Sequence, residues 1–136
     1  GSKLKSLSDY IYGFTVGSDV ATVKGIIEGV AGNNTVIIYD SSDNEISSGL
    51  IATGQKIKIS NKTTSQTFTV VVKGDTSGDG VINALDLLQV QKNILDTYTL
   101  TGAYKEAGET SGDGVINALD LLQVQKSILG TYTINQ

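Results

Sequence analysis

The chain has 136 residues and a mass of 14.2 kDa, enough for one domain or two very small ones. It contains no His, Cys, Met, Trp, Arg or Pro, which excludes zinc sites built on Cys or His, disulfides, thiol nucleophiles and His-based acid–base relays. No apolar run approaches the roughly 20 residues that a membrane span needs.

The net charge of −4 is divided unequally along the chain. Residues 1–73 hold seven Lys and six acidic residues, a net charge of +1, whereas residues 74–136 hold three Lys and eight acidic residues, a net charge of −5. The acidic half would repel a phosphate backbone, so we expect a cation and no nucleic acid as its partner. Gly1-Ser2 is similar to a residue pair left by cloning, and the absence of an initiator Met suggests a fragment of a longer protein.

Residues 3–73 predict a small β-rich module with one helix. Strands with alternating β-branched or aromatic residues are expected at residues 10–16, 35–40, 55–60 and 66–73. A helix is expected from an N-cap at Ser18 to about Gly29, with Gly29 or Gly32 ending it. Its inner side would carry Val20, Val23, Ile27 and Val30. Because the last strand reaches Lys73 and an acidic loop opens at Asp75, we expect this module to pack against the rest of the chain.

The remainder of the chain is a duplication. Residues 75–100 recur as residues 109–134, 34 positions later, with 22 of 26 positions identical. Each copy begins with an acidic, glycine-containing loop and continues with helical periodicity. The apolar stripe of the first helix is expected to comprise Leu87, Val90 and Ile94, flanked by Leu88 and Leu95. The stripe of the second is expected to comprise Leu121, Val124 and Ile128, flanked by Leu122 and Leu129. Matching stripes predict two helices that pack on each other.

Each acidic loop has the spacing of a twelve-residue calcium loop. Such a loop places oxygen ligands at positions 1, 3, 5 and 12, a backbone carbonyl at position 7 and a water-mediated ligand at position 9. The first loop supplies Asp75, Ser77, Asp79, the carbonyl of Val81, Asn83 and Asp86. The second supplies Glu109, Ser111, Asp113, the carbonyl of Val115, Asn117 and Asp120. We therefore expect two Ca²⁺ sites, with Ile82 and Ile116 pairing in a short strand contact between the loops.

Two structural interpretations compete with calcium binding. The loops would be ordinary turns, or Asp86 and Asp120 would be acids in the first turn of a helix. Neither explains why three carboxylates crowd into each loop, where they repel one another without a cation. The longer Glu109 at the first position predicts a distorted or weaker second site, and Asp at position 12 of both loops argues against a calcium sensor.

A partner surface is expected on the side of each helix opposite its core stripe. At about 100° per residue, the first helix places there Leu85, Gln89, Lys92 and Asp96. The second helix places there Leu119, Gln123, Lys126 and Gly130. A single exposed leucine is common on protein surfaces, but its recurrence beside a lysine favours a contact surface with an apolar centre and a polar rim.

Residues 74–136 resemble a type I dockerin, through the duplicated loop and helix, the Asp at each twelfth position and the strand before the first loop. Residues 100–107 are similar to the short middle helix of that family. The resemblance implies an all-α pair of half-EF-hand repeats that is ordered by two calcium ions and docks onto a cohesin domain of a scaffold or cell-surface protein. It implies that near-identical faces permit two binding orientations and that the cohesin is chosen by Ala84, Leu85, Gln91, Lys92, Ala118, Leu119, Gln125 and Lys126.

The resemblance also implies a secreted bacterial protein of the cellulosome type, attached to the cell surface, in which this chain is a monomer or forms a 1:1 complex with cohesin. Dockerins end glycoside hydrolases and other components, so a catalytic domain for polysaccharide degradation elsewhere in the parent protein stays open. Residues 3–73 are similar to the X modules that precede some dockerins, and we expect them to have a stabilising role. The expected fold is α+β, with a β-rich module packed on an all-α pair of loop–helix repeats.

Two other functions stay open. A calcium-stabilised structural or adhesion module would bind polysaccharide through the N-terminal aromatic residues Tyr10, Tyr12, Phe14, Tyr39 and Phe68. An enzyme would draw paired carboxylates from an expected exposed turn that contains Asp40, Asp43 and Glu45. Because this turn implies no pocket, we expect no enzymatic activity in these residues.

Overall fold

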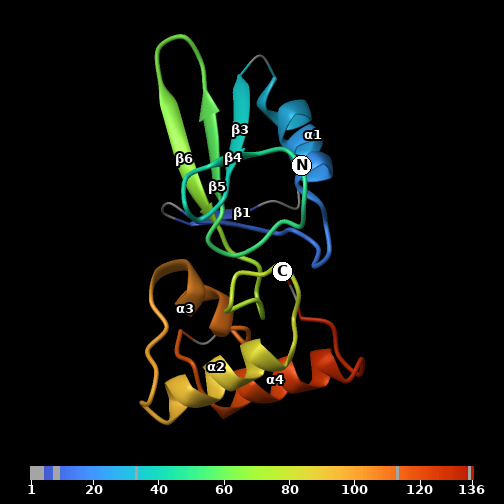
Figure 1. The fold of residues 1–136 in the computed structure, drawn as a ribbon, viewed down its shortest axis with the longest axis vertical. Helices are drawn as coiled ribbons and strands as arrows, with labels where there is room; N and C mark the ends of the chain where they lie inside the picture. The colour runs from blue at the N-terminus through green and yellow to red at the C-terminus, as the bar shows by residue number, and fades with distance from the viewer. Residues whose placement is uncertain (1–4, 8–9, 33, 113, 135) are drawn as a thin grey trace.

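The computed structural model describes residues 5–7, 10–32, 34–112, 114–134 and 136. A sheet with one helix forms the upper part of the molecule in Figure 1, and three further helices form the lower part. All strands of the described residues precede Val71, and the described residues that follow form helices and loops. None of the described helices has both the length and the apolar character needed to cross a membrane.

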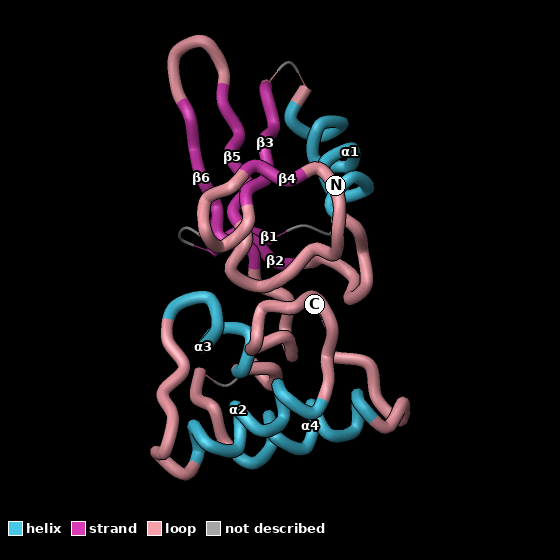
Figure 2. Tube along the Cα trace, in the orientation of Figure 1, coloured by secondary structure: helices cyan, strands magenta, loops and turns pink. Residues whose placement is uncertain are grey.

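Six strands form one sheet in the order β1-β2-β6-β5-β3-β4 (Figure 2). They span β1 Lys5–Leu7, β2 Tyr10–Tyr12, β3 Thr35–Tyr39, β4 Glu45–Ile46, β5 Lys56–Ser60 and β6 Ser65–Val70. β2 and β6 run parallel, and every other neighbouring pair is antiparallel. The sheet therefore contains both parallel and antiparallel pairs. With its helices and strands, the chain is a mixed α/β protein.

Two expected strands are shorter than their alternating sequences suggested. β2 ends at Tyr12, not at residue 16, because Gly13 adopts φ of 104°, which lies outside the β region. β6 ends at Val70, where the Val71 N–H donates to the carbonyl of Ile11 in β2 at 3.0 Å and so completes the pairing of Val70 with Ile11. β1 and β4 were not expected, because they contain only three and two residues.

Helix α1 (Val20–Ala31) packs on the sheet beside β3. Val20, Val23 and Ile27 are buried on its inner side. The core that they join also contains Ile11, Phe14, Val36, Ile38, Ile51, Ile57, Val70 and Val72. Burial of these apolar side chains holds the helix against the sheet.

The expected start of α1 needs correction, whereas one of the two glycines expected at its end is confirmed. Asp19, not Ser18, is the N-cap, because its Oδ1 accepts the N–H of Thr22 at 2.7 Å. The last helical residue is Ala31, and the C-cap is Gly32, one of the two expected glycines, which adopts φ of 66°. Val30 was expected inside, but it is 63% exposed, because the last turn of the helix extends past the core.

The C-terminal part contains α2 (Ala84–Ile94), α3 (Gly102–Gly108) and α4 (Ala118–Ile128). α2 and α4 lie side by side, and each begins with a capping box, made by Asn83 with Asp86 and by Asn117 with Asp120. Their small shared core comprises Val90, Val124 and Ile134, with the partly buried Ile82, Leu87, Ile116, Leu121 and Tyr132 against it. The expected strand contact between the loops is wrong for the described residues, because Ile82 and Ile116 pack into this core and lie in no strand.

The stripe between α2 and α4 is narrower than expected. Leu88 and Leu95 are 44% and 63% exposed, and their counterparts Leu122 and Leu129 are 44% and 69% exposed. Two helices that pack only on each other bury one line of side chains each, so the flanking leucines stay outside. Ile94 and Ile128, which were expected on the stripe itself, are also exposed, at 36% and 38%. These two isoleucines and the four leucines are corrections to the expected core.

A third apolar cluster joins the two parts of the chain. It comprises Tyr12 and Val71 from the N-terminal part, Ala103 and Ala107 from α3, and the partly buried Tyr10. Hydrogen bonds across this junction include one from the Tyr12 hydroxyl to Glu106 Oε2 at 3.1 Å. The N-terminal part thus packs against α3 through these side chains.

Candidate metal centre

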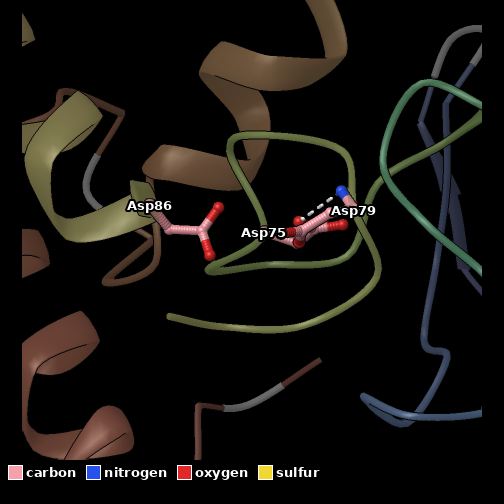
Figure 3. Close-up of side chains that lie close together, drawn as sticks. All are labelled: Asp75, Asp79 and Asp86. Atoms are coloured by element: carbon pink, nitrogen blue, oxygen red, sulfur yellow. Dashed lines mark hydrogen bonds between the residues drawn. The ribbon is translucent and has the colours of Figure 1, made fainter. Parts of the chain in front are cut away.

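The first acidic loop brings three carboxylates together. One oxygen atom from each of Asp75, Asp79 and Asp86 lies within 4.8 Å of the others, and Figure 3 shows these three side chains converging. Asp75 and Asp86 are buried, whereas Asp79 is exposed. Several carboxylate oxygens around one point are the donors that a hard cation such as Ca²⁺ requires.

Asp75 organises the loop backbone around its own carboxylate. Its Oδ1 accepts the N–H groups of Gly78 and Asp79, both at 3.1 Å, and its Oδ2 accepts the N–H of Gly80 at 3.0 Å. Gly78 and Gly80 adopt φ of 78° and 86°, a left-handed conformation that favours glycine. A fourth N–H comes from the N-terminal part of the chain, where Thr53 donates to Asp75 Oδ2 at 3.1 Å.

Asp86 connects the beginning of α2 to the loop. Its Oδ2 accepts the N–H of Asn83, and its Oδ1 accepts the N–H of Ser77, both at 2.8 Å. The Asn83 side-chain amide donates to Asp79 Oδ2 at 3.0 Å, and the Val81 N–H donates to Asp79 Oδ1 at 3.1 Å. Hydrogen bonds therefore link all six ligand positions of the first loop into one assembly.

Ser77 supplies the test of whether these residues fit a bound cation. Its Oγ is buried and makes no hydrogen bond of good geometry with any described residue. It lies close enough to the Asp79 and Asp86 carboxylates to favour their charged forms. A buried hydroxyl without a partner costs about 1–3 kcal/mol, and Ser77 stands at loop position 3, where a calcium loop places an oxygen ligand. Ca²⁺ in the loop would accept this oxygen as a ligand, so the residues present fit the ion.

Burial makes the first loop costly without a cation. It raises the pKa of the Asp75 carboxyl to about 7, although the N–H groups of Thr53 and Gly80 favour the charged form. Burial also raises the pKa of Asp86, against the N–H groups of Asn83 and Ser77. A divalent cation would stabilise the ionised carboxylates and remove this cost.

The second loop repeats the connection between helix and loop. Asp120 Oδ1 accepts the N–H of Ser111 at 2.9 Å, and Asp120 Oδ2 accepts the N–H of Asn117 at 2.8 Å. Asn117 Oδ1 accepts the N–H of Leu119 at 3.0 Å, as an N-cap does. The buried Asp120 thus holds the start of α4 as Asp86 holds the start of α2.

Glu109 accepts hydrogen bonds from its own loop, as its shorter counterpart Asp75 does. Its Oε1 accepts the N–H of Gly112 at 2.7 Å and the Ser111 hydroxyl at 3.3 Å. Val115 is 56% exposed, and Asp113 lies outside the described residues. A distorted or weaker second site therefore stays a prediction.

The expected partner residues divide into two groups. Leu85 and Leu119 are 49% and 48% exposed. The other exposed members are Ala84, Gln91, Lys92, Asp96, Ala118, Gln125, Lys126 and Gly130. Gln89 and Gln123 turn toward the loops instead, where their Oε1 atoms accept the hydroxyls of Thr76 at 2.7 Å and Thr110 at 2.6 Å.

The helix faces contain four leucines that the sequence placed in the core, namely Leu88, Leu95, Leu122 and Leu129. The paired leucines at residues 87–88 and 121–122 were the available signal, because adjacent residues of a helix differ by about 100° and cannot both face one partner. Asp96 and Gly130 both adopt positive φ, of 60° and 77°, directly after the helix caps. This conformation accounts for a residue position at which Asp in one copy becomes Gly in the other.

The structure gives little support to the two alternative functions, a polysaccharide-binding module and an enzyme. Tyr12 and Phe14 are buried, and Tyr10, Tyr39 and Phe68 are partly buried, so the aromatic side chains form no exposed platform. Among the acids of the turn before β4, Asp40 Oδ1 accepts the N–H groups of Ser42 and Asn44, both at 2.9 Å. Asp43 forms an ion pair with Lys56 at 2.5 Å. Hydrogen bonds of the turn and a surface ion pair account for these carboxylates.

Comparison with known proteins identifies the C-terminal part. Residues 73–129 match the family model of the dockerin type I domain. No curated protein and no solved structure matches the chain significantly. Dockerin domains are docking modules without catalytic activity that bind Ca²⁺ and cohesin domains. The matched segment begins two residues before Asp75 and includes both acidic loops, α2, α3 and α4. Residues 73–129 of this chain are therefore similar to, and consistent with, a type I dockerin domain.

Proposed function

We propose that this chain is a calcium-dependent docking module that binds a cohesin domain through the outer faces of α2 and α4. The observation that carries the proposal is the repetition of one arrangement in both copies. In each copy a buried aspartate, Asp86 or Asp120, joins an acidic loop to a helix that exposes the same leucines and the same lysine.

Calcium would act on this face through the capping boxes. Asp75, Ser77, Asp79, Asn83 and Asp86, with the carbonyl of Val81, would hold the ion in the first loop. The equivalent residues of the second loop would hold another ion, with Glu109 making that site the weaker one. The carboxylates that bind the ions also fix the first turns of α2 and α4. Calcium therefore orders the helices that carry the partner surface.

The docking face has an apolar centre and a basic rim. Leu85, Leu88 and Leu95 of the α2 copy are exposed beside Lys92, and their counterparts in the α4 copy are exposed beside Lys126. α2 and α4 lie at the end of the molecule away from the sheet, which leaves room for a partner (Figure 1). Since the two helices repeat one sequence, a cohesin would bind in either of two orientations related by a half-turn.

The remaining features follow from this role. Residues 3–73 would form an X-module-like domain that stabilises residues 74–136. The chain would be a monomer that forms a 1:1 complex with cohesin. It would anchor a secreted bacterial protein to a scaffold or to the cell surface in an assembly of the cellulosome type, where a catalytic domain outside this chain degrades polysaccharide.

Calorimetry of the full chain against a panel of cohesin domains tests the proposal. We expect binding in calcium and no binding by the metal-free chain, and the double variant Asp86→Asn, Asp120→Asn should lose binding in calcium. Binding that survives the removal of calcium contradicts the proposal, and so does a calcium-loaded chain that binds no cohesin of the panel.

A further inference from the structure

The two calcium loops have almost the same sequence but different surroundings. A Cβ atom on Gly78 would lie 2.8 Å from the carbonyl oxygen of Thr53, and one on Gly80 would lie 2.7 Å from Leu50 Cβ and 3.1 Å from the Ile51 oxygen. A Cβ on their counterparts Gly112 and Gly114 would meet no atom within 4 Å. Residues 50–54, which we call the lid segment, therefore cover Gly78 and Gly80 of the first loop, whereas among the described residues no such segment lies against Gly112 and Gly114 of the second.

The lid segment also contributes directly to the first metal centre. The Thr53 N–H donates to Oδ2 of Asp75, the first expected ligand, at 3.1 Å, and both residues are buried. Glu109, at the same position of the second loop, accepts hydrogen bonds from Gly112 and Ser111 of its own loop. A donor from the N-terminal part thus holds the orientation of the Asp75 carboxylate.

The lid segment is itself held in place from two sides. The Thr53 hydroxyl donates to the carbonyl of Val72 at 3.1 Å and accepts the Val72 N–H at 3.0 Å. Gly54 packs so closely on the ring of Tyr104 in α3 that a Cβ there would overlap the Tyr104 hydroxyl. The segment therefore cannot leave the loop without breaking contacts to both parts of the chain.

We propose that the lid segment makes the two calcium sites unequal, so that the first loop binds Ca²⁺ more tightly and releases it more slowly than the second. A ligand that is already oriented loses less freedom when the ion binds, and burial leaves its carboxylate in greater need of a cation. By linkage, calcium in the first loop strengthens the attachment of the N-terminal part. The inference rests on the proposed calcium binding of both loops.

Matched alanine variants in the full chain test the lid. Gly80 and Gly114 occupy loop position 6 with φ of 86° and 89°, so Gly80→Ala and Gly114→Ala introduce the same backbone strain, and only the first collides with the lid segment. Calcium titrations followed by NMR, with the amide signals of each loop read separately, give one affinity per loop. We expect the wild-type first loop to be tighter by on the order of tenfold. Gly80→Ala should weaken its own loop on the order of tenfold more than Gly114→Ala weakens the second.

A second variant keeps the proposal testable if Gly80→Ala does not fold. Thr53→Val keeps the size of the side chain and the backbone N–H but removes the hydroxyl that anchors the lid segment to Val72. We expect it to weaken calcium binding in the first loop and to leave the second unchanged. In the wild type, hydrogen exchange of the Thr53 amide should slow when calcium is added.

The outcomes separate this inference from the proposed function. If both loops bind calcium with equal affinity, or if Gly80→Ala and Gly114→Ala weaken their loops equally, the proposal about the lid segment is contradicted. Calcium-dependent docking is then unaffected. If neither loop binds calcium, the proposal about the lid segment and the proposed docking function are both contradicted. If Gly80→Ala weakens its loop more than Gly114→Ala weakens the second but no cohesin binds, the lid proposal is supported and the proposed docking function is contradicted. Unequal wild-type affinities alone do not decide, since Glu109 would also weaken the second loop.

Discussion

Burial of Asp75 should couple the stability of the metal-free protein to pH. Its pKa is raised from 3.8 to about 7, so between these values the folded chain keeps a proton that the unfolded chain has lost. The contribution of this group to the free energy of unfolding is complete below its unfolded pKa and is lost as the pH rises through about 7. Melting temperatures of the metal-free wild type, compared with those of Asp75→Asn, which cannot titrate there, measure the effect.

A calcium-saturated sample is the control for this prediction. The cation replaces the proton as the partner of Asp75, so the fall in stability toward neutral pH should disappear. A wild-type chain without metal that gains melting temperature relative to Asp75→Asn between about pH 4 and 7 would show that burial does not set this pKa.

Ser77→Ala should have opposite effects in the presence and absence of metal. In the metal-free chain it removes a buried hydroxyl without a partner, so the free energy of unfolding should stay equal or rise by about 1 kcal/mol. In calcium it removes a ligand, so the calcium affinity should fall. Denaturant unfolding and calorimetry measure the two effects, and a loss of stability in both states would mean that Ser77 Oγ has a structural partner.

For α2 and α4, the repeated docking face predicts that substitutions in the two copies have non-additive effects on cohesin binding. Leu85→Ser and Leu119→Ser should each weaken cohesin binding only about twofold, because the other orientation remains. The double variant should weaken it by on the order of a hundredfold, because both apolar anchors are lost. The double variant Ile26→Ser, Val30→Ser on α1 is a matched control, since these side chains are also 47% and 63% exposed but lie on another face. Full loss of binding in one single variant would indicate one orientation.

Much of the helical architecture could be predicted from local sequence. α2 and α4 each begin directly after the Asn of a capping box, whose Asp is the third residue of the helix, so these signals lie close together in the sequence. The face of each helix was harder to predict, because Leu87 and Leu88 carry the same apolar signal and only tertiary packing decides which is buried. β4, at Glu45–Ile46, was read as a turn because a two-residue strand has no periodicity.

In the whole molecule, the contact between Tyr12 and Glu106 should make the two parts unfold together. The hydroxyl of the nearly buried Tyr12 donates to Glu106 at 3.1 Å, and the Tyr12 ring packs in the cluster with Val71, Ala103 and Ala107. Tyr12→Phe should lower the free energy of unfolding by about 1–2 kcal/mol. Tyr98→Phe, at a 46% exposed tyrosine, should have little effect. Calcium-loaded wild type that unfolds in two separate transitions would contradict this coupling.

Contacts between residues far apart in the chain could not be predicted from the sequence. The length of the junction at residues 73–75 indicated contact between the two parts, but no local pattern marks Thr53 as a donor to Asp75, because 22 residues separate them. The sequence likewise predicted two similar calcium loops, whereas the fold surrounds them differently. Such differences arise from tertiary packing and not from the residues of either loop.

The number of calcium ions bound by the full chain tests the central claim most directly. Native mass spectrometry at saturating calcium should find two ions per chain, and the double variant Asp86→Asn, Asp120→Asn should bind none, because these buried aspartates complete the two loops. A wild-type chain that binds one ion or none would contradict the claim that both loops are calcium sites.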